Sequence, residues 1–234
     1  MKKIPLEENT ALWIKEKTMC TRFYAALSPE LRPIIEAARK MNIAEQMMRF
    51  LAKPINMTGE IRPTDMAAVI APNKRGERAV FPMLWGFYEE NLHKPLVNCR
   101  VETAKVKPLW SDSWKQRRCV IPASYYFEWQ HYTDTKGKVR TGDKYAIQPC
   151  GSDVTYLAGL YRIEEMRDLK YPVFAVVTRS PTNELREIHD RMPLILPESA
   201  IDEWISPDGD ANRLINKAVT ELVIEKAEKG RTLL

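Results

Sequence analysis

Side chains able to do covalent or acid–base chemistry gather in four short segments of this 234-residue chain. They supply a thiol, a carboxamide, a carboxylate, a histidine and several arginines. A thiol with a histidine and a carboxylate can form a thiol-nucleophile site. Residue type alone leaves structural roles open, because a lone histidine is often structural and a carboxylate in an aromatic strand can face solvent. The segments are Met19-Cys20-Thr21-Arg22-Phe23, Asn98-Cys99-Arg100-Val101-Glu102-Thr103, Tyr126-Phe127-Glu128-Trp129 and Ile188-His189-Asp190-Arg191-Met192-Pro193.

Taken in this order, the segments resemble one family, the SOS response-associated peptidases, also called abasic-site processing proteins. The combination of Asn-x-Arg-x-Glu-Thr, Phe-Glu-Trp and His-Asp-Arg-Met-Pro makes the resemblance specific. It runs from about Met19 to about Val223. Further matching segments are Trp85-Gly86 and Arg118-Cys119-Val120-Ile121-Pro122-Ala123.

The resemblance implies a covalent reaction with DNA. In that family a cysteine that follows the initiator methionine becomes N-terminal, and its α-amine and thiol capture the aldehyde of an abasic deoxyribose as a thiazolidine. Both groups are usable near neutral pH, because an α-amine has a pKa of roughly 8 and a thiol of roughly 8.5. Ring closure on one residue is intramolecular and therefore fast. The resemblance makes Cys20 the nucleophile.

The resemblance also implies roles for other polar residues. We expect Glu128 to be the general acid/base that opens the sugar ring, and His189 to donate a second proton or hold the sugar hydroxyl. Asn98 is expected to orient Cys20 or the new ring by hydrogen bonds. The implied partner is single-stranded DNA with an abasic site, where arginines bind phosphates and tryptophans stack on bases. The expected DNA contacts are Arg22, Arg100, Trp85, Trp129 and Thr178.

Some of these residues have ordinary structural alternatives. Trp85 could be a plain core residue. Arg100 could pair with Glu102 instead of a phosphate, and Asp190 with Arg191 could form a local ion pair that shapes its loop.

Two features depart from the family pattern. Thr21 stands where the family usually has glycine, which restricts the backbone next to the nucleophile. Residues 1–18 precede Met19 and, while attached, leave Cys20 without a free α-amine. Synthesis could begin at Met19, which we favour, or the arm could be cleaved, or the thiol could act alone. Two other functions also stay open: a thiol (auto)peptidase that removes the segment before Cys20, and a non-covalent module that binds single-stranded DNA.

The composition fits a globular domain and does not by itself indicate a function. The chain is 44% hydrophobic and has a formal net charge of +5, which is too mild to indicate nucleic-acid binding by itself. The basic cluster Lys115, Arg117 and Arg118 is typical of a solvated face. No run of about 18 apolar residues and no apolar signal core is present, so we expect a cytoplasmic protein without a membrane span.

The cysteines indicate free thiols and not a metal site. The chain has four of them, with neither a CxxC pair nor zinc-site spacing. In a reducing compartment they stay free, and the apolar surroundings of Cys99 and Cys119 predict buried packing residues. We expect no metal, no small-molecule cofactor and a monomer.

Hydrophobic patterning predicts the elements that must position these residues. Ser28 and Pro29 read as the start of a helix, and further helices are expected over 43–51, 197–205 and 210–218. A turn at Asn73-Lys74-Arg75-Gly76 joins runs 66–71 and 79–85 into a hairpin. The remaining strand candidates are 119–121, 125–129, 145–147, 154–160 and 173–178, with a loop at 136–138.

These elements predict one α+β domain, built on a mostly antiparallel sheet or open barrel with flanking helices. The expected division is an arm over 1–18, of which 2–17 is a short helix or loose, then a domain over 19–225 and a tail over 226–234.

Overall fold

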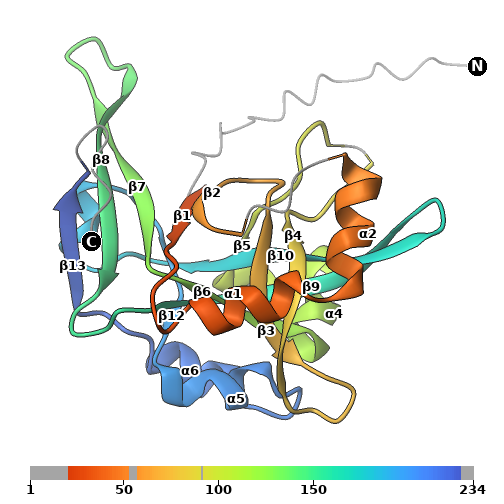
Figure 1. Cartoon of the computed structure of the whole chain (residues 1–234). Coiled ribbons are helices and arrows are strands. Elements are labelled where there is room, and N and C mark those ends of the chain that lie inside the picture. The colour runs from red at the N-terminus through yellow and green to blue at the C-terminus, as the bar shows by residue number, and fades with distance from the viewer. Residues whose placement is uncertain (1–20, 53–56, 91, 228–234) are drawn as a thin grey trace, which may run out of the picture.

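The computed structural model describes residues 21–52, 57–90 and 92–227 of the chain (Figure 1). The predicted arm therefore lies outside the described residues. Within them, one sheet has five strands in the order β13 (Leu222–Lys226), β8 (Val139–Pro149), β7 (Tyr125–Thr133), β1 (Arg22–Ala25) and β2 (Gly59–Ile61).

The second sheet has eight strands and contains a closed barrel. Its order is β11-β10-β4-β3-β6-β9-β12, with β5 also paired to β10, and β9 pairs with β10 as well as with β6. The ring β10-β4-β3-β6-β9 is therefore closed, and within it only the β10–β4 pairing is parallel. The strands are β3 (Met66–Pro72), β4 (Arg78–Trp85), β5 (Asn98–Arg100), β6 (Arg118–Ala123), β9 (Thr155–Met166), β10 (Leu169–Arg179), β11 (Met192–Pro193) and β12 (Ile195–Leu196).

The fold class predicted from the sequence is confirmed, and the barrel is closed. All predicted strands are present, but β9 and β10 reach 12 and 11 residues, well beyond their apolar cores. Their extra length forms the long hairpin that projects from the barrel on the side opposite β7 and β8 (Figure 1). This pairing supplies the contact that closes the ring.

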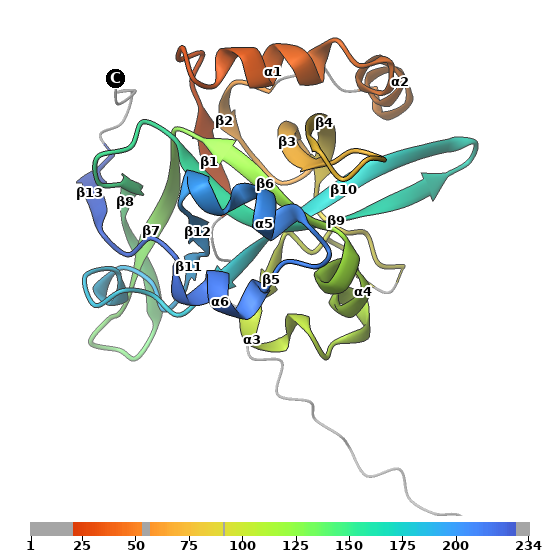
Figure 2. The ribbon, with the colours of Figure 1, turned by 90° about the horizontal axis from the view of Figure 1, so that it is seen from below.

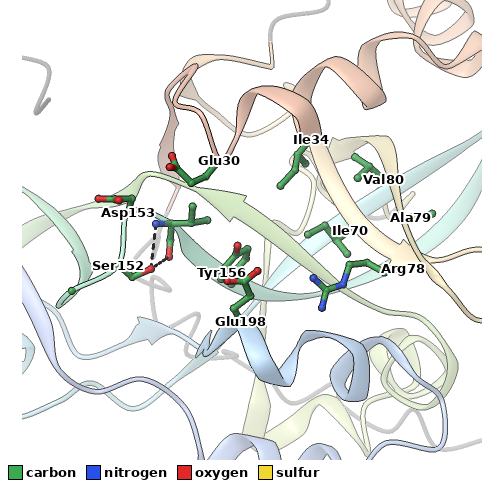
Figure 3. Close-up of a pocket in the computed structure, with 12 residues that line it drawn as sticks. Glu30, Ile34, Ile70, Arg78, Ala79, Val80, Ser152, Asp153, Tyr156 and Glu198 are labelled. Carbon is green, nitrogen blue, oxygen red and sulfur yellow. Dashed lines mark hydrogen bonds between the residues drawn. The ribbon is translucent and has the colours of Figure 1, made fainter.

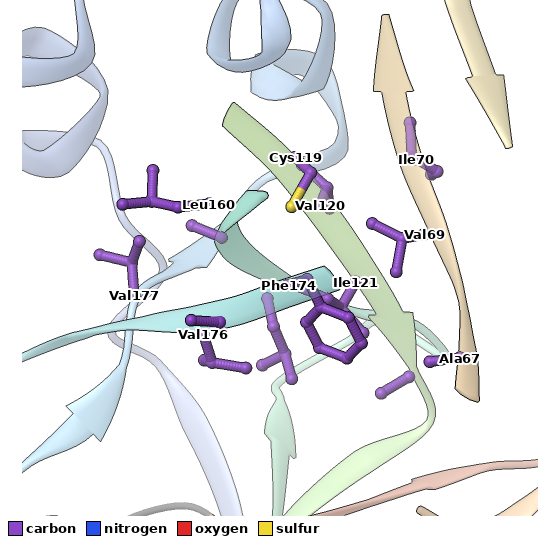
Figure 4. Close-up of a cluster of buried hydrophobic side chains, with 14 of the residues drawn as sticks. Ala67, Val69, Ile70, Cys119, Val120, Ile121, Leu160, Phe174, Val176 and Val177 are labelled. Atoms are coloured by element: carbon purple, nitrogen blue, oxygen red, sulfur yellow. The ribbon is translucent and has the colours of Figure 1, made fainter. Parts of the chain in front are cut away.

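Apolar side chains fill the barrel, and full burial of each large one stabilises the fold by about 1.5–3 kcal/mol. The packing leaves no room for a side chain at Gly159, because a Cβ there would lie 2.5 Å from Ile121 Cδ1 and 2.9 Å from Cys119 Sγ. Figure 4 shows part of this core, contributed by Ala67, Val69 and Ile70 of β3, Cys119, Val120 and Ile121 of β6, Leu160 of β9, and Phe174, Val176 and Val177 of β10.

Helices cover the barrel on two sides (Figure 2). On one side lie α1 (Arg32–Arg39) and α2 (Asn42–Leu51), and on another α3 (Val101–Ala104) and α4 (Pro108–Gln116). Near β12 the chain forms η2 (Glu198–Ala200), α5 (Ile201–Ile205) and α6 (Ala211–Asn216), and η1 (Leu185–Glu187) precedes β11. None of the helices in the described ranges is long and apolar enough to cross a membrane.

The helix predicted from Ser28 begins later than expected. The Ser28 hydroxyl accepts a hydrogen bond from the Leu31 amide at 3.3 Å, so it caps a turn, and α1 starts at Arg32. The sequence patterns did not predict α3 and α4 or the strands β1, β2, β5 and β13, most of which are short.

The basic cluster in the sequence predicted that Arg118 lies on a solvated face. In the structure Arg118 is buried. Its guanidinium donates to the carbonyls of Trp114 in α4 (2.8 Å), Trp204 in α5 (2.6 Å), Ser206 and Gly209 (3.1 Å). These carbonyls lie at or just beyond the C-terminal ends of the two helices, where backbone dipoles favour a cation. Burial lowers the Arg118 pKa. One side chain thus joins two helix ends to the barrel.

Replacement of Arg118 by Met should lower the free energy of unfolding by on the order of 3 kcal/mol or more, because several buried carbonyls lose their donor. Arg118→Lys should restore little of the lost free energy of unfolding, since one ammonium lacks the planar set of donors with which the guanidinium reaches both helices. The measurement is urea denaturation, with the exposed neighbour Lys115→Met as the control, expected within about 0.5 kcal/mol of the parent. A parent-like midpoint for Arg118→Met would contradict this role.

Candidate functional site

Glu128 lies on β7 beside the first described residues of the chain. The pairing of Arg22 with Phe127 brings the start of β1 alongside it. A pocket of about 240 Å³ opens there, lined by Thr21, Arg22, Glu128, Trp129, His131 and Thr141. Glu128 is only 2% exposed, and the Trp129 amide donates to its Oε1 at 3.2 Å. Cys20 lies outside the described residues, but it is the residue covalently attached to Thr21.

His189 approaches the same pocket through a contact with His131. The two ring centroids are 5.1 Å apart, with the rings tilted by 61°. The His131 amide also donates to the Ile188 carbonyl at 3.0 Å, which holds β7 against the 188–191 loop. Sequence reasoning did not single out His131, although it stands three residues after Glu128.

The hydrogen bonds of His189 indicate its tautomer. Its Nδ1 accepts from the Arg191 amide at 3.1 Å and lies 3.0 Å from Asp190 Oδ1. One nitrogen cannot both accept from an amide and donate to a carboxylate. Asp190 is 65% exposed and can turn away, whereas the amide is fixed by the backbone. We therefore assign the neutral form, with the proton on Nε2.

Arg191 ties the histidine loop to the barrel. It donates to both oxygens of Glu102, at 2.6 and 2.7 Å, and to the Thr178 carbonyl at 2.9 Å. Partial burial raises the pKa of Glu102, but the hydrogen bonds from Arg191 and from its own backbone outweigh it and hold the pKa below the usual range. The principal partner of Arg191 is thus Glu102 and not Asp190.

Asn98 and Arg100 lie on the adjoining edge, on β5. They pair in parallel with Val176 and Thr178 of β10, and Asn98 is half-buried while Arg100 is exposed. Thr178 also pairs with Pro193 of β11, so β10 lies between β5 and β11, and Arg191 links the loop that carries His189 to Glu102, which follows β5.

Trp85 and Thr178, two of the expected DNA contacts, have buried side chains. The Trp85 ring is fully buried between Phe23 and Phe174, with centroids 5.1 and 5.8 Å away, and its Nε1 donates to the Val97 carbonyl at 3.0 Å. Thr178 is also fully buried, and its hydroxyl donates to the Cys99 carbonyl at 3.3 Å. Both side chains brace the site from within the core.

Arg22 and Trp129 are half-exposed at the pocket, inside a cluster of cations. Arg22 and Lys144 each lie 2.8 Å from the Glu60 carboxylate, and Arg62 lies 3.0 Å from it. Arg22 and Lys144 also approach the Trp129 ring, at 5.0 and 5.2 Å. Burial raises the pKa of Glu60, but Lys144 and Arg22 outweigh it and hold it below the usual range. Three cations therefore surround one carboxylate beside an aromatic ring.

Residues 19–229 match the family described as SOS response associated peptidase (SRAP). The chain belongs to this family. Similar curated proteins are the abasic site processing proteins YoaM of Bacillus subtilis, 31% identical over 121 residues, and YedK of Escherichia coli, 30% identical over 125. These matches cover 51% and 53% of this chain and 51% and 54% of the relatives, so the chain spans about half the length of the curated relatives it matches.

Solved structures share the fold of this SRAP chain. A protein from Bacteroides thetaiotaomicron superimposes with a TM-score of 0.67 over 89% of this chain and 92% of its own, at 15% identity. A phage-related protein from Bordetella bronchiseptica gives a TM-score of 0.63 over 89% of this chain and 94% of its own, at 19% identity.

None of the three thiols in the described part of this SRAP chain lines the pocket at Glu128. Burial raises the pKa of Cys99 to about 12 and that of Cys119 well above its usual value, which confirms them as packing residues. Cys150 is a free thiol and is exposed. In residues 21–52, 57–90 and 92–227, no three His, Cys, Asp or Glu side chains are grouped to hold a metal ion.

Larger hollows lie away from these residues and have the wrong charge for DNA. One of about 570 Å³ places the carboxylates of Glu30, Asp153 and Glu198 around an apolar floor, with Arg78 at its edge (Figure 3). Arg78 is itself paired with Asp202 at 2.7 Å. A second, of about 630 Å³, shares Glu30 and Asp153. Such carboxylates repel anions, so the smaller pocket at Glu128 is the better candidate for a functional site.

Proposed function

We propose that this chain captures abasic sites in single-stranded DNA as a covalent link through Cys20. The observation that carries the proposal is the buried Glu128 carboxylate, which lines a pocket that opens at Thr21, the neighbour of Cys20. The names of the relatives, abasic site processing proteins, point to the same substrate.

The proposed reaction begins at the sugar ring. In an abasic deoxyribose C1′ is a hemiacetal carbon that carries a hydroxyl group. Glu128 transfers the proton of this C1′ hydroxyl to the ring oxygen, which opens the ring and releases the aldehyde. The Cys20 amine attacks C1′ and loses one water to give a Schiff base. The Cys20 thiolate then adds to the imine carbon while the nitrogen takes a proton, which closes the thiazolidine. The net change is the loss of one water.

His189 serves as a hydrogen-bond donor in this scheme. With Nδ1 engaged by the Arg191 amide, its proton is on Nε2. Nε2 can then donate to the sugar hydroxyl or assist departure of water. Asn98, on β5 of the eight-stranded sheet, would orient the Cys20 amine or the new ring.

The DNA would approach over the cationic cluster. Arg22 and Lys144 flank Trp129, a combination that suits a phosphate backbone with an unstacked base. Arg100, exposed on β5, would hold another phosphate. Access to C1′ requires an unpaired and bendable strand, so single-stranded DNA should react faster than duplex, and binding should weaken with salt.

The Cys20→Ala variant of protein beginning at residue 20 should form no heat-stable adduct with a single-stranded oligonucleotide that carries one abasic site. The matched control is Cys150→Ala, which removes an exposed thiol away from the pocket and should react at the parent rate. Denaturing gels after heating measure the adduct. An equally stable adduct from Cys20→Ala, or equal rates on duplex and single strands, would contradict the proposal.

A further inference from the structure

We propose that His131 is a positioning residue of the reaction pocket. As the pH falls, His131 takes the first proton that the His131–His189 pair binds, and it thereby keeps His189 in its neutral form with the proton on Nε2. This inference rests on the proposed function for its role in catalysis, but its geometric basis is independent of it. The chain has three histidines: His131 lines the pocket, His189 lies behind it in contact with His131, and His93 is exposed on a loop before β5.

The backbone fixes His131 in this position. The register of β7 against β8 shifts between Trp129 and His131, so β8 carries one extra residue there. Gly142 lies at this bulge, where a Cβ would come within 3.0 Å of the Gln130 side chain. Bulges re-aim the side chains beside them. The His131 amide then bonds the Ile188 carbonyl at 3.0 Å, which brings the two imidazoles together.

At this separation the two rings cannot easily both be charged. The centroids are 5.1 Å apart, and the His189 side chain is fully buried. Two unit charges at that distance repel strongly enough to disfavour the doubly protonated pair by roughly a hundredfold in a partly buried site. The pair therefore titrates as a unit, with one proton taken well before the second.

The surroundings favour His131 as the holder of that proton. The His131 ring is half-exposed in the pocket, so water reaches its open edge although its Nδ1 is buried, whereas the whole His189 side chain is buried and its Nδ1 already accepts from the Arg191 amide. The Asp190 carboxylate lies near His189 Nδ1 and favours protonation of His189 instead, but Asp190 is mostly exposed, so solvent screens its charge. The other ionisable groups that face the pair are Glu128 on β7, Arg22 on β1 and Arg191 on the loop, while β8 presents Thr141, which does not titrate.

The consequence is a reaction that tolerates mild acid. A proton that enters the pocket stays on His131, next to Glu128 and the incoming phosphates, and His189 keeps the form in which Nδ1 accepts and Nε2 donates. Without His131, His189 would take the first proton, and the hydrogen bond from the Arg191 amide would be lost.

The test is an NMR titration of the three histidine rings in the protein without DNA. His131→Gln should move the titration midpoint of His189 upward by about one pH unit or more, while His93 stays unchanged as the internal control. In His189→Gln the midpoint of His131 should stay near its parent value. A His189 midpoint that does not move in His131→Gln would overturn the inference, as would a large rise for His131 in His189→Gln, which would mean that His189 holds the proton.

The kinetic readout separates this role from a structural one. Relative to the parent, His131→Gln should lose about tenfold more of its rate of adduct formation near pH 6 than at pH 8, and His131→Lys, which keeps a cation, should restore the rate at pH 6. Equal slowing at all pH values would overturn the inference and leave His131 a packing residue. Because the NMR titration uses no DNA, its outcome stands even if the covalent reaction fails.

Discussion

Glu128→Gln should slow adduct formation by about 10²–10⁴-fold and leave the affinity for DNA nearly unchanged. The amide keeps the shape and the hydrogen bond from the Trp129 amide, but it cannot exchange a proton with the sugar. Ring opening would then depend on solvent alone. Because the side chain is buried, water has poor access to the same atoms and can replace Glu128 only in part.

Single-turnover adduct formation beside a binding titration measures both effects for each variant. Arg100→Ala is the matched comparison, because an exposed arginine on β5 should affect binding and not chemistry. We expect weaker binding, a salt dependence reduced by about one phosphate contact, and near-normal linkage at saturating DNA. If Glu128→Gln reacts at the parent rate, Glu128 is a structural residue and the chemistry rests on Cys20 and solvent.

Any residue left in front of Cys20 should abolish the stable adduct. An amide nitrogen is not a nucleophile, so a chain that retains residues 1–19 can offer only its thiol to the aldehyde, and a thiol alone gives a reversible hemithioacetal. Protein beginning at Cys20 should react to completion under the same conditions.

A protein that begins with serine at position 20 provides the control for this prediction. Cys20→Ser keeps the amine, so borohydride should trap its Schiff base, but no heat-stable product should form without reduction. Intact mass of the longer chain before DNA is added completes the comparison, because spontaneous loss of residues 1–19 would favour the peptidase alternative. A heat-stable adduct from a chain that keeps its arm would contradict the α-amine mechanism.

Patterns along the sequence predicted most of the fold, and the misses have physical causes. The hairpin of β3 and β4 was predicted because apolar runs flank a clear turn signal. Closure of the barrel was not, because it depends on which strands pair: β9 pairs with both β6 and β10, and periodicity along one strand does not reveal its partners. Helix α4 lacks an apolar run, since only Trp110 and Trp114 supply large buried side chains.

Arg118 and Trp85 show the limits of residue type. A charged residue in a basic cluster predicts a solvated face, yet Arg118 finds its partners in helix-end carbonyls that no sequence pattern marks. Trp85 was assigned to DNA by family resemblance, and the structure buries it between Phe23 and Phe174.

The candidate site was predicted in part. The motifs predict Glu128 and His189 as site residues; Glu128 lines the pocket, and His189 contacts the pocket residue His131. His131 was missed because its significance depends on a ring contact with a residue far along the chain. The environment of Cys20 lies outside the described residues.

The most direct test of the central claim is the intact mass of the adduct between protein beginning at Cys20 and a single-stranded abasic oligonucleotide. The proposed thiazolidine has the sum of the two masses less one water, and its modified peptide should start at Cys20 with the amine and the thiol both blocked. A product that carries the DNA on another residue, or that leaves the Cys20 thiol free to alkylation, would contradict it.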